Sequence, residues 1–128
     1  MLYDIEKSAD KIVEVAKDKF IKANALLTQK SPLVVLYGPS GSGKKTAVKL
    51  ANKNLSEEGK HYASYEIRRL RDSEEVYKVI KKNQEDGACY AGFPNICYTT
   101  TFQEVADGLA EKDDVSVIKM VPHQTPIR

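Results

Sequence analysis

A nine-residue segment of the chain combines three glycines, three hydroxyl side chains and two lysines. It reads Gly-Pro-Ser-Gly-Ser-Gly-Lys-Lys-Thr over residues 38–46 and directly follows the apolar run 33–37. Glycine lets backbone N–H groups approach and surround an anion, whereas a Cβ atom would obstruct them. The first lysine would place its ammonium on the β- and γ-phosphates of a nucleotide. The pattern predicts a phosphate-binding loop between a strand and a helix, formed by these residues: Gly38, Pro39, Ser40, Gly41, Ser42, Gly43, Lys44, Lys45 and Thr46.

One position of this segment departs from the usual pattern of such loops. In the form G-x-x-x-x-G-K-[ST], the hydroxyl that coordinates Mg²⁺ directly follows the lysine. Lys45 occupies that position, and Thr46 comes one residue later. Thr46 has two interpretations: a ligand of Mg²⁺ after a shift of the first helical turn, or a helix-start hydroxyl bonded to the backbone. The expected cofactor is therefore ATP or GTP, with Mg²⁺ left open.

Hydrolysis of a bound triphosphate would need further acidic groups. An acid usually holds the metal, and a second group orients the attacking water. Such an acid is expected at the end of an apolar strand, but Asp113 and Asp114 precede the last apolar segment instead. Glu66, near the end of segment 61–67, is the candidate for a metal-side or water-orienting carboxylate; its alternative is an ordinary exposed strand residue. Lys44 and Glu66 are therefore the candidate catalytic residues.

Two more groups of side chains follow expected strands. Arg68, Arg69 and Arg71 would reach the phosphates or a neighbouring subunit's site, or they would form a solvated turn. The threonines at 99–101 would place a hydroxyl near a γ-phosphate, or they would end a strand and begin a helix. Thr101 and Glu104 have the spacing of a capping box, which predicts a helix start at that point.

Helical and strand patterns alternate along the chain. Four such alternations predict a three-layer α/β fold, an αβα arrangement with a mostly parallel sheet of about four or five strands. In this kind of sheet, ligands bind beyond the carboxyl ends of the strands, which is where the loop is expected. We expect one minimal nucleotide-binding domain over residues 1–128, with an N-terminal helix at about 4–28. The expected helices are 4–28, 44–56, 72–84 and 101–110, and the expected strands are 33–37, 61–67, 95–100 and 115–121.

The composition narrows the class of protein. A chain of 128 residues with 41% hydrophobic and 30% charged residues can build a core and is not disordered by composition. A net charge of +2 gives little support to nucleic-acid binding, and Cys89 and Cys97 make no recognisable zinc pattern. No stretch is apolar enough to span a membrane, and the first residues do not read as a signal peptide, so we expect a cytoplasmic protein.

The loop GPSGSGKKT resembles that of the P-loop NTPases. Its double lysine followed by threonine is similar to the variant loop of some small clamp-loader subunits of the AAA+ family, and the preceding helix and strand look like the entry to an AAA+ core. The resemblance implies a P-loop NTPase-like fold, ATP binding, Lys44 as the phosphate lysine, and Thr99 or Thr100 near a sensor position. A weaker likeness links Glu66 to the glutamate that follows the second strand in secretion and pilus-retraction ATPases. No acidic strand end matches the second nucleotide motif of these families.

Three functions remain compatible with these residues. The favoured one is binding of a nucleoside triphosphate by a small P-loop protein, with weak or partner-dependent hydrolysis on a larger protein machine or by self-association. The second is a small-molecule or nucleotide kinase. The third is a catalytically inactive module that binds a nucleotide or another anion. No recognisable segment reads the base.

Overall fold

The described part of the chain alternates between helices and strands, as the sequence predicts. The computed structural model describes residues 2–25, 33–56, 60–87, 90, 92, 93 and 95–122, with residues 18–25 described by their backbone. The helices are α1 (Ile5–Ala25), α2 (Lys44–Lys53), α3 (Ser73–Glu85) and α4 (Gln103–Ala110), and the strands are β1 (Leu33–Tyr37), β2 (Tyr62–Glu66), β3 (Asn95–Thr100) and β4 (Val115–Lys119).

The described strands form one parallel sheet in the order β2-β3-β1-β4. Strand β1 is interior: Val34 pairs with Cys97 of β3 on one side and with Ser116 of β4 on the other. An interior parallel strand is covered on both faces, which explains why the run from Leu33 to Leu36 is apolar without alternation and buried throughout. The predicted parallel sheet is confirmed, with four strands among the described residues.

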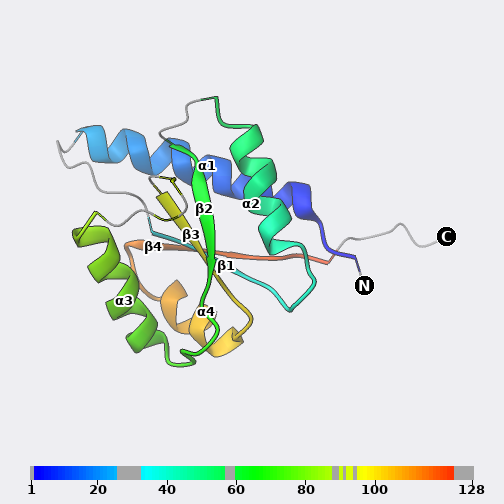
Figure 1. The fold of residues 1–128 in the computed structure, drawn as a ribbon, viewed down its shortest axis with the longest axis vertical. Helices are drawn as coiled ribbons and strands as arrows, with labels where there is room; N and C mark the ends of the chain where they lie inside the picture. Colours follow the sequence, from blue (N-terminus) through cyan, green and yellow to red (C-terminus); the bar gives the residue numbers. More distant parts are fainter. Residues whose placement is uncertain are drawn as a thin grey trace.

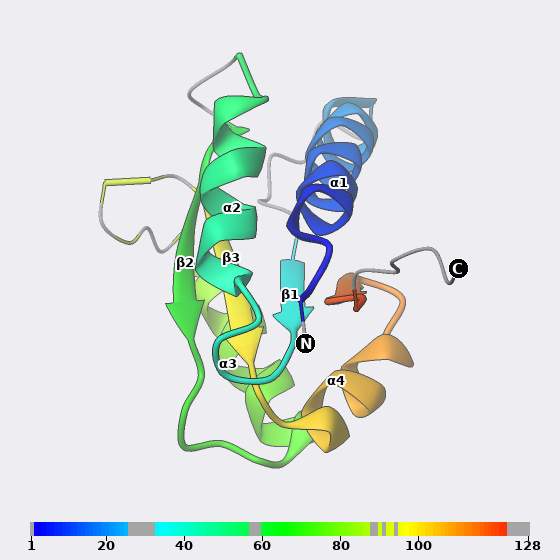
Figure 2. The same ribbon diagram turned by 90° about the vertical axis from the view of Figure 1, so that its right-hand side faces the viewer.

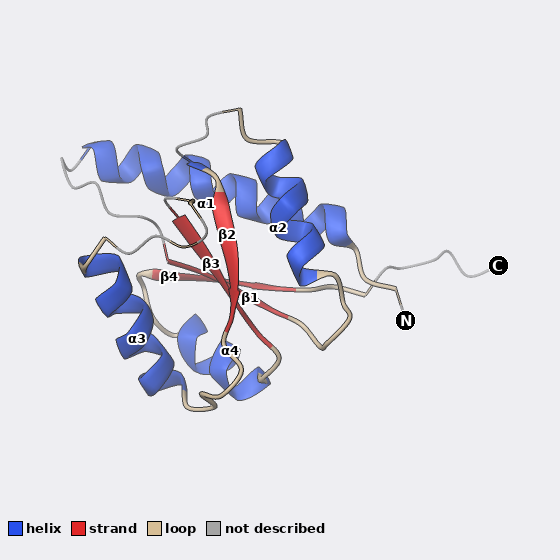
Figure 3. Ribbon diagram, in the orientation of Figure 1, coloured by secondary structure: helices blue, strands red, loops and turns tan. Residues whose placement is uncertain are grey.

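Two helices cover each face of the sheet (Figure 1 and Figure 3). One apolar cluster joins α1 and α2 to the sheet, and a second joins α3 and α4 to the opposite face. Successive residues of β1 belong to different clusters, because side chains of a strand alternate between its faces: Val34 and Leu36 to the first, Leu33 and Val35 to the second. This arrangement confirms the predicted three-layer α/β fold.

Several element ends differ from the sequence prediction. Helix α2 ends at Lys53, three residues before the predicted 56, because the N–H of Asn54 closes the last turn on the carbonyls of Leu50 and Ala51 and Leu55 then returns to the core. Helix α1 is described as far as Ala25, and the rest of its predicted range lies outside the described residues.

The predicted capping box before α4 is wrong. Helix α4 begins at Gln103, and its N-cap is Phe102 rather than Thr101. The hydroxyl of Thr100 accepts a hydrogen bond from the Phe102 N–H at 3.1 Å. A threonine at the strand end thus makes the turn that the sequence pattern assigned to Thr101 and Glu104.

Cys97 is a core residue of β3. Its side chain is fully buried in the cluster beneath α1 and α2, and this burial raises the pKa of its thiol to about 12. The thiol therefore stays protonated and packs as a small apolar group. Cys89 lies outside the described residues.

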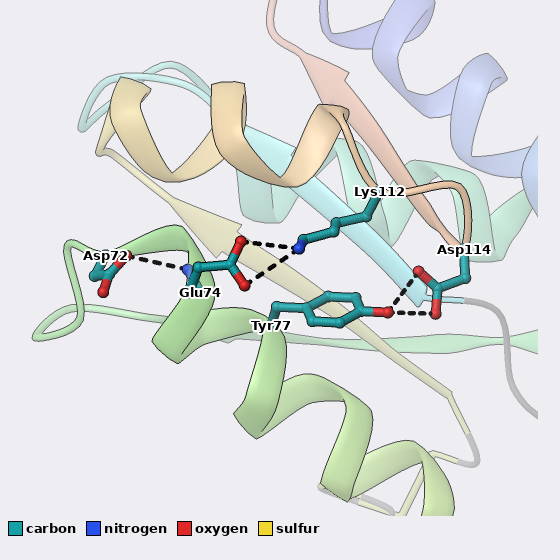
Figure 4. A network of polar contacts seen from close by, with 5 residues as sticks. All are labelled: Asp72, Glu74, Tyr77, Lys112 and Asp114. Atoms are coloured by element: carbon teal, nitrogen blue, oxygen red, sulfur yellow. Dashed lines mark hydrogen bonds and ion pairs between the residues drawn. The ribbon is translucent and has the colours of Figure 1, made fainter.

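Polar contacts join α3 to the turn between α4 and β4 (Figure 4). The Tyr77 hydroxyl donates to both carboxylate oxygens of Asp114, at 3.0 and 2.9 Å, and Lys112 pairs with Glu74 at 2.8 Å. Asp114 precedes β4, so these contacts lie at the amino ends of the strands and hold α3 in place there. Within the described range, no helix is long and apolar enough to cross a membrane.

The connections of the chain lead one to expect a crevice at the opposite end of the sheet. Neighbouring strands β1 and β3 lead to α2 and α4, which lie on different faces (Figure 2). The chain therefore leaves two adjacent carboxyl ends in opposite directions. Crevices of this kind are where open α/β sheets bind their ligands.

Candidate functional site

The loop 38–46 connects β1 to α2 at this crevice. Gly41 and Gly43 have φ angles of +79° and +94°, in the left-handed region that residues with a Cβ atom rarely adopt. Gly43 directly precedes the helix. The first N–H groups of α2, which have no acceptors within the helix, therefore begin at the end of the loop and favour an anion there.

The loop packs closely against the start of α1 and the residue that follows β4. A Cβ atom on Gly38 would lie 2.6 Å from Cγ of Met120 and 2.6 Å from Oγ of Ser42. A Cβ atom on Gly43 would lie 2.7 Å from Cδ1 of Ile5, in the first turn of α1. These contacts explain why glycine occupies both positions and fix the loop against the end of β4 and the start of α1.

Lys44 is buried within the loop, with only 7% of its surface exposed. Its Nζ donates to the carbonyls of Gly38 at 2.7 Å and Pro39 at 3.0 Å. Burial lowers the pKa of Lys44, because it disfavours the charged form, and the carboxylate of Glu66 acts in the opposite direction. The ammonium thus lies against the carbonyls at the start of the loop.

A pocket of about 560 Å³ opens beside the loop. This size is within the usual range of small-molecule sites, about 300–1,000 Å³. Six of the nine predicted loop residues line it; Gly38, Pro39 and Ser42 do not. The full lining is Ser40, Gly41, Gly43, Lys44, Lys45, Thr46, Ser64, Tyr65, Glu66, Arg68, Tyr90 and Thr99.

Glu66 lies in the same pocket as Lys44, so the structure brings the two candidate catalytic residues together. It is the single carboxylate among the residues that line the pocket. Its Oε2 accepts a hydrogen bond from Nε of Arg68 at 2.8 Å, but Arg68 is 79% exposed. An ion pair this exposed contributes little to stability, about 0–1 kcal/mol, so Glu66 is not firmly held by it.

Of the other candidates, Thr99 lies at the pocket, whereas Arg71 and Thr100 lie outside its lining. Arg71 pairs with Glu104 at 3.3 Å, and its guanidinium lies 4.6 Å from the ring centroid of Phe102, which fits a surface turn. Thr99 lines the pocket, whereas Thr100 is fully buried and bonded to the backbone of the next turn.

The two residues considered for the magnesium position lie in the first turn of α2. Lys45 and Thr46 are the second and third residues of the helix, and both are exposed and line the pocket. Mg²⁺ prefers oxygen ligands, and Thr46 shares this edge with the ammonium of Lys45. No cluster of three acidic, histidine or cysteine side chains that would hold a metal occurs among the described residues.

Sequence reasoning missed three residues of the pocket: Ser64, Tyr65 and Tyr90. Ser64 and Tyr65 belong to the segment 61–67, for which the sequence predicts a strand and no role at a site. Tyr90 follows α3, in a stretch without a helical or strand pattern. The strand order brings these residues to the loop, and no local pattern specifies that order.

Only the residues of the pocket itself indicate what it binds. Unrelated activities share three-layer α/β folds, so the fold alone does not specify a function. No protein-family model, curated protein or solved structure matches this chain.

Proposed function

We propose that the protein binds a nucleoside triphosphate, with ATP as the first candidate, and that the phosphates lie on the loop 38–46. The observation that carries this proposal is the burial of the Lys44 side chain inside a glycine-rich turn. Two neutral carbonyls are modest partners for a buried ammonium, whereas phosphate oxygens form stronger, charge-assisted hydrogen bonds. The crevice, the positive φ angles and the helix start support the same ligand. We infer on the same grounds a relationship to the P-loop NTPases, with an AAA+-like loop.

We propose that hydrolysis is weak or depends on a partner. Glu66 would orient the attacking water, but no second carboxylate lines the pocket among the described residues. Thr99 would contact the terminal phosphate from the neighbouring strand. A larger protein machine, or a second copy of this chain, would supply the missing charged groups and raise the rate.

The residues that line the pocket on the side of β2 favour one other activity, a small-molecule or nucleotide kinase. The pocket continues past Lys44 to Ser64 and Arg68 on the side of β2. An acceptor there would lie beside the terminal phosphate that Lys44 holds. Transfer of phosphate to added acceptors, measured against hydrolysis, separates this activity from an ATPase.

Calorimetric titration of ATP and GTP, with and without Mg²⁺, tests the proposed function. We expect Lys44→Met to weaken binding about 10-fold or more, because hydrogen bonds to a charged group contribute about 1.5–3 kcal/mol. The matched control is Lys49→Met, which removes an exposed lysine of α2 outside the pocket and should bind as the parent does.

The outcomes of this titration have distinct meanings. Absence of binding, or equal binding by the Lys44 and Lys49 variants, would reject the nucleotide site. Binding that strengthens with Mg²⁺ would support an NTPase, and a partner-stimulated ATPase assay would follow. Binding that is indifferent to Mg²⁺, without turnover, would identify an inactive nucleotide- or anion-binding module.

A further inference from the structure

Two tyrosine rings lie at the pocket on the side of β2. The rings of Tyr65 and Tyr90 are arranged edge-to-face, with centroids 5.1 Å apart and an interplanar angle of 84°. Both residues line the pocket and remain 44% and 47% exposed. An edge-to-face pair occupies one face of one ring, so other ring faces stay available to a third planar group.

Contacts with the core hold this pair in place. The ring of Tyr65 also lies 6.1 Å from the ring of Tyr98, at 68°, and Tyr98 is only 3% exposed. The hydroxyl of Tyr98 accepts a hydrogen bond from the side-chain amide of Asn83 on α3 at 3.0 Å. The three rings therefore run from the buried core to the pocket, and Tyr65 acts as the support between Tyr98 and Tyr90.

The backbone of Tyr90 is held independently of its ring. Its N–H and carbonyl both bond to Phe93, at 3.4 and 3.0 Å, and Gly92 between them has a φ of +81°. The backbone bonds hold the Cα of Tyr90 in place, and the contact with the Tyr65 ring reduces the conformational freedom that the Tyr90 ring would lose when a ligand binds. This preorganisation increases affinity.

We propose that Tyr90, supported by Tyr65, forms a subsite for a nucleobase in the pocket that contains the loop. This inference rests on the proposed function, because it places the phosphates on the loop and a planar ring on the tyrosines. Aromatic side chains stack on every base, since each base has a π-face. The guanidinium of Arg68 also lines the pocket and offers hydrogen bonds to the ribose or the base edge, whereas Glu66 keeps the role proposed above. The ring is the base of the loop-bound nucleotide itself or that of a second nucleoside.

Three probes separate the ring from the phosphates: ATP, inorganic tripolyphosphate and adenosine. Each is titrated calorimetrically into the full chain and into Tyr90→Ala, Tyr90→Phe and Val79→Ala. We expect Tyr90→Ala to weaken ATP binding about 10-fold, in line with stacking on a single aromatic side chain, and to leave tripolyphosphate binding unchanged. Tyr90→Phe keeps the ring and should bind as the parent does. Val79, on α3 outside the pocket, is 44% exposed and serves as the control.

Two results support the subsite and identify the source of the ring. A preference for ATP over tripolyphosphate that disappears in Tyr90→Ala assigns the ring to the bound nucleotide. The other result is that ATP and tripolyphosphate bind equally, and that adenosine binds together with tripolyphosphate only when residue 90 is aromatic. This result assigns the ring to a second nucleoside.

Two results overturn the subsite. The first is that Tyr90→Ala changes neither the preference for ATP over tripolyphosphate nor the affinity for adenosine. The second is an equal loss in Tyr90→Ala and Tyr90→Phe, which would assign the effect to the hydroxyl. Failure of the loop proposal gives a different result: Lys44→Met would leave the affinity for tripolyphosphate unchanged. The adenosine titration would still test the tyrosines in that case.

Discussion

Two glycines of the loop share a backbone conformation but differ in the space around them. Gly41 and Gly43 both have positive φ, at +79° and +94°. A Cβ atom on Gly41 would contact nothing within 4 Å, whereas one on Gly43 would lie 2.7 Å from Ile5. The conformational cost therefore applies to both positions and the steric cost only to the second.

Alanine substitution at these two positions should give unequal losses of stability. We expect Gly41→Ala to lower the free energy of unfolding by about 1 kcal/mol, from backbone strain alone. We expect Gly43→Ala to lower it by about 2–4 kcal/mol, because overpacking against Ile5 adds to the strain. Urea denaturation without nucleotide measures both values.

A double variant isolates the steric part of this difference. Shortening Ile5 to alanine makes room for the new methyl group, so Gly43→Ala should cost less in the Ile5→Ala background than in the parent. Equal losses at Gly41 and Gly43, or no coupling between Gly43 and Ile5, would contradict the proposed packing of α1 against the loop.

At the scale of elements, a charged network holds α3 against the turn before β4. Asp114 accepts two hydrogen bonds from Tyr77 and pairs with Lys81 at 2.8 Å. Lys112 of the same turn lies 4.7 Å from the centroid of the Tyr77 ring (Figure 4). Burial acts to raise the pKa of Asp114, but the hydrogen bonds from Lys81 and Tyr77 outweigh it and lower the pKa below its ordinary value.

This network should stabilise the protein in a pH-dependent way. A carboxyl group with a lowered pKa in the folded state contributes stability above its unfolded pKa, about 4, and loses it as the pH falls through the folded pKa. We therefore expect Asp114→Asn to be less stable than the parent at pH 7 and the difference to vanish in acid. The loss should not exceed about 1 kcal/mol, because 41% of the Asp114 side chain is exposed.

Urea denaturation at several pH values measures this effect. The matched control is Asp113→Asn, which removes the neighbouring exposed carboxylate and should change stability less at pH 7. A difference between the parent and Asp114→Asn that stays constant down to acid pH would show that the carboxylate charge is not its cause.

The elements were predictable where local signals agree with the tertiary structure. Strand β1 begins and ends as predicted because its apolar run stops at a glycine that the loop requires. The N-cap of α3 also follows its local pattern, since the Asp72 carboxylate accepts a hydrogen bond from the Glu74 N–H. The start of α4 was not predictable, because the hydroxyl of Thr100 competes with the expected cap.

The candidate site was predictable in its local part only. The loop and Lys44 are adjacent in sequence, so their spacing alone brings them together. The contact of Tyr90 with Tyr65 depends on the position of β2 at the sheet edge and on a turn that has no helical or strand pattern. Long-range placement of this kind follows from strand order, which hydrophobic periodicity does not encode.

At the scale of the whole molecule, the described residues form two apolar clusters that share one sheet. Ile12 of α1 and Leu109 of α4 are fully buried on opposite faces. Strand β1 contributes side chains to both clusters, so loss of either helix layer exposes one face of the same strand. The layers should therefore unfold together, as the sequence-based prediction of a single domain requires.

Alanine substitution in each cluster tests this cooperativity. We expect Ile12→Ala and Leu109→Ala each to lower the free energy of unfolding by about 2–5 kcal/mol, from lost burial and the cavity left behind. The two losses should add within about 0.5 kcal/mol, because the sheet separates the two sites. Amide hydrogen exchange gives the decisive measurement: Leu109→Ala should accelerate the slowest amides of α1 as much as those of α4. If the amides of α1 kept their protection, the two faces would unfold separately and the single-domain prediction would be wrong.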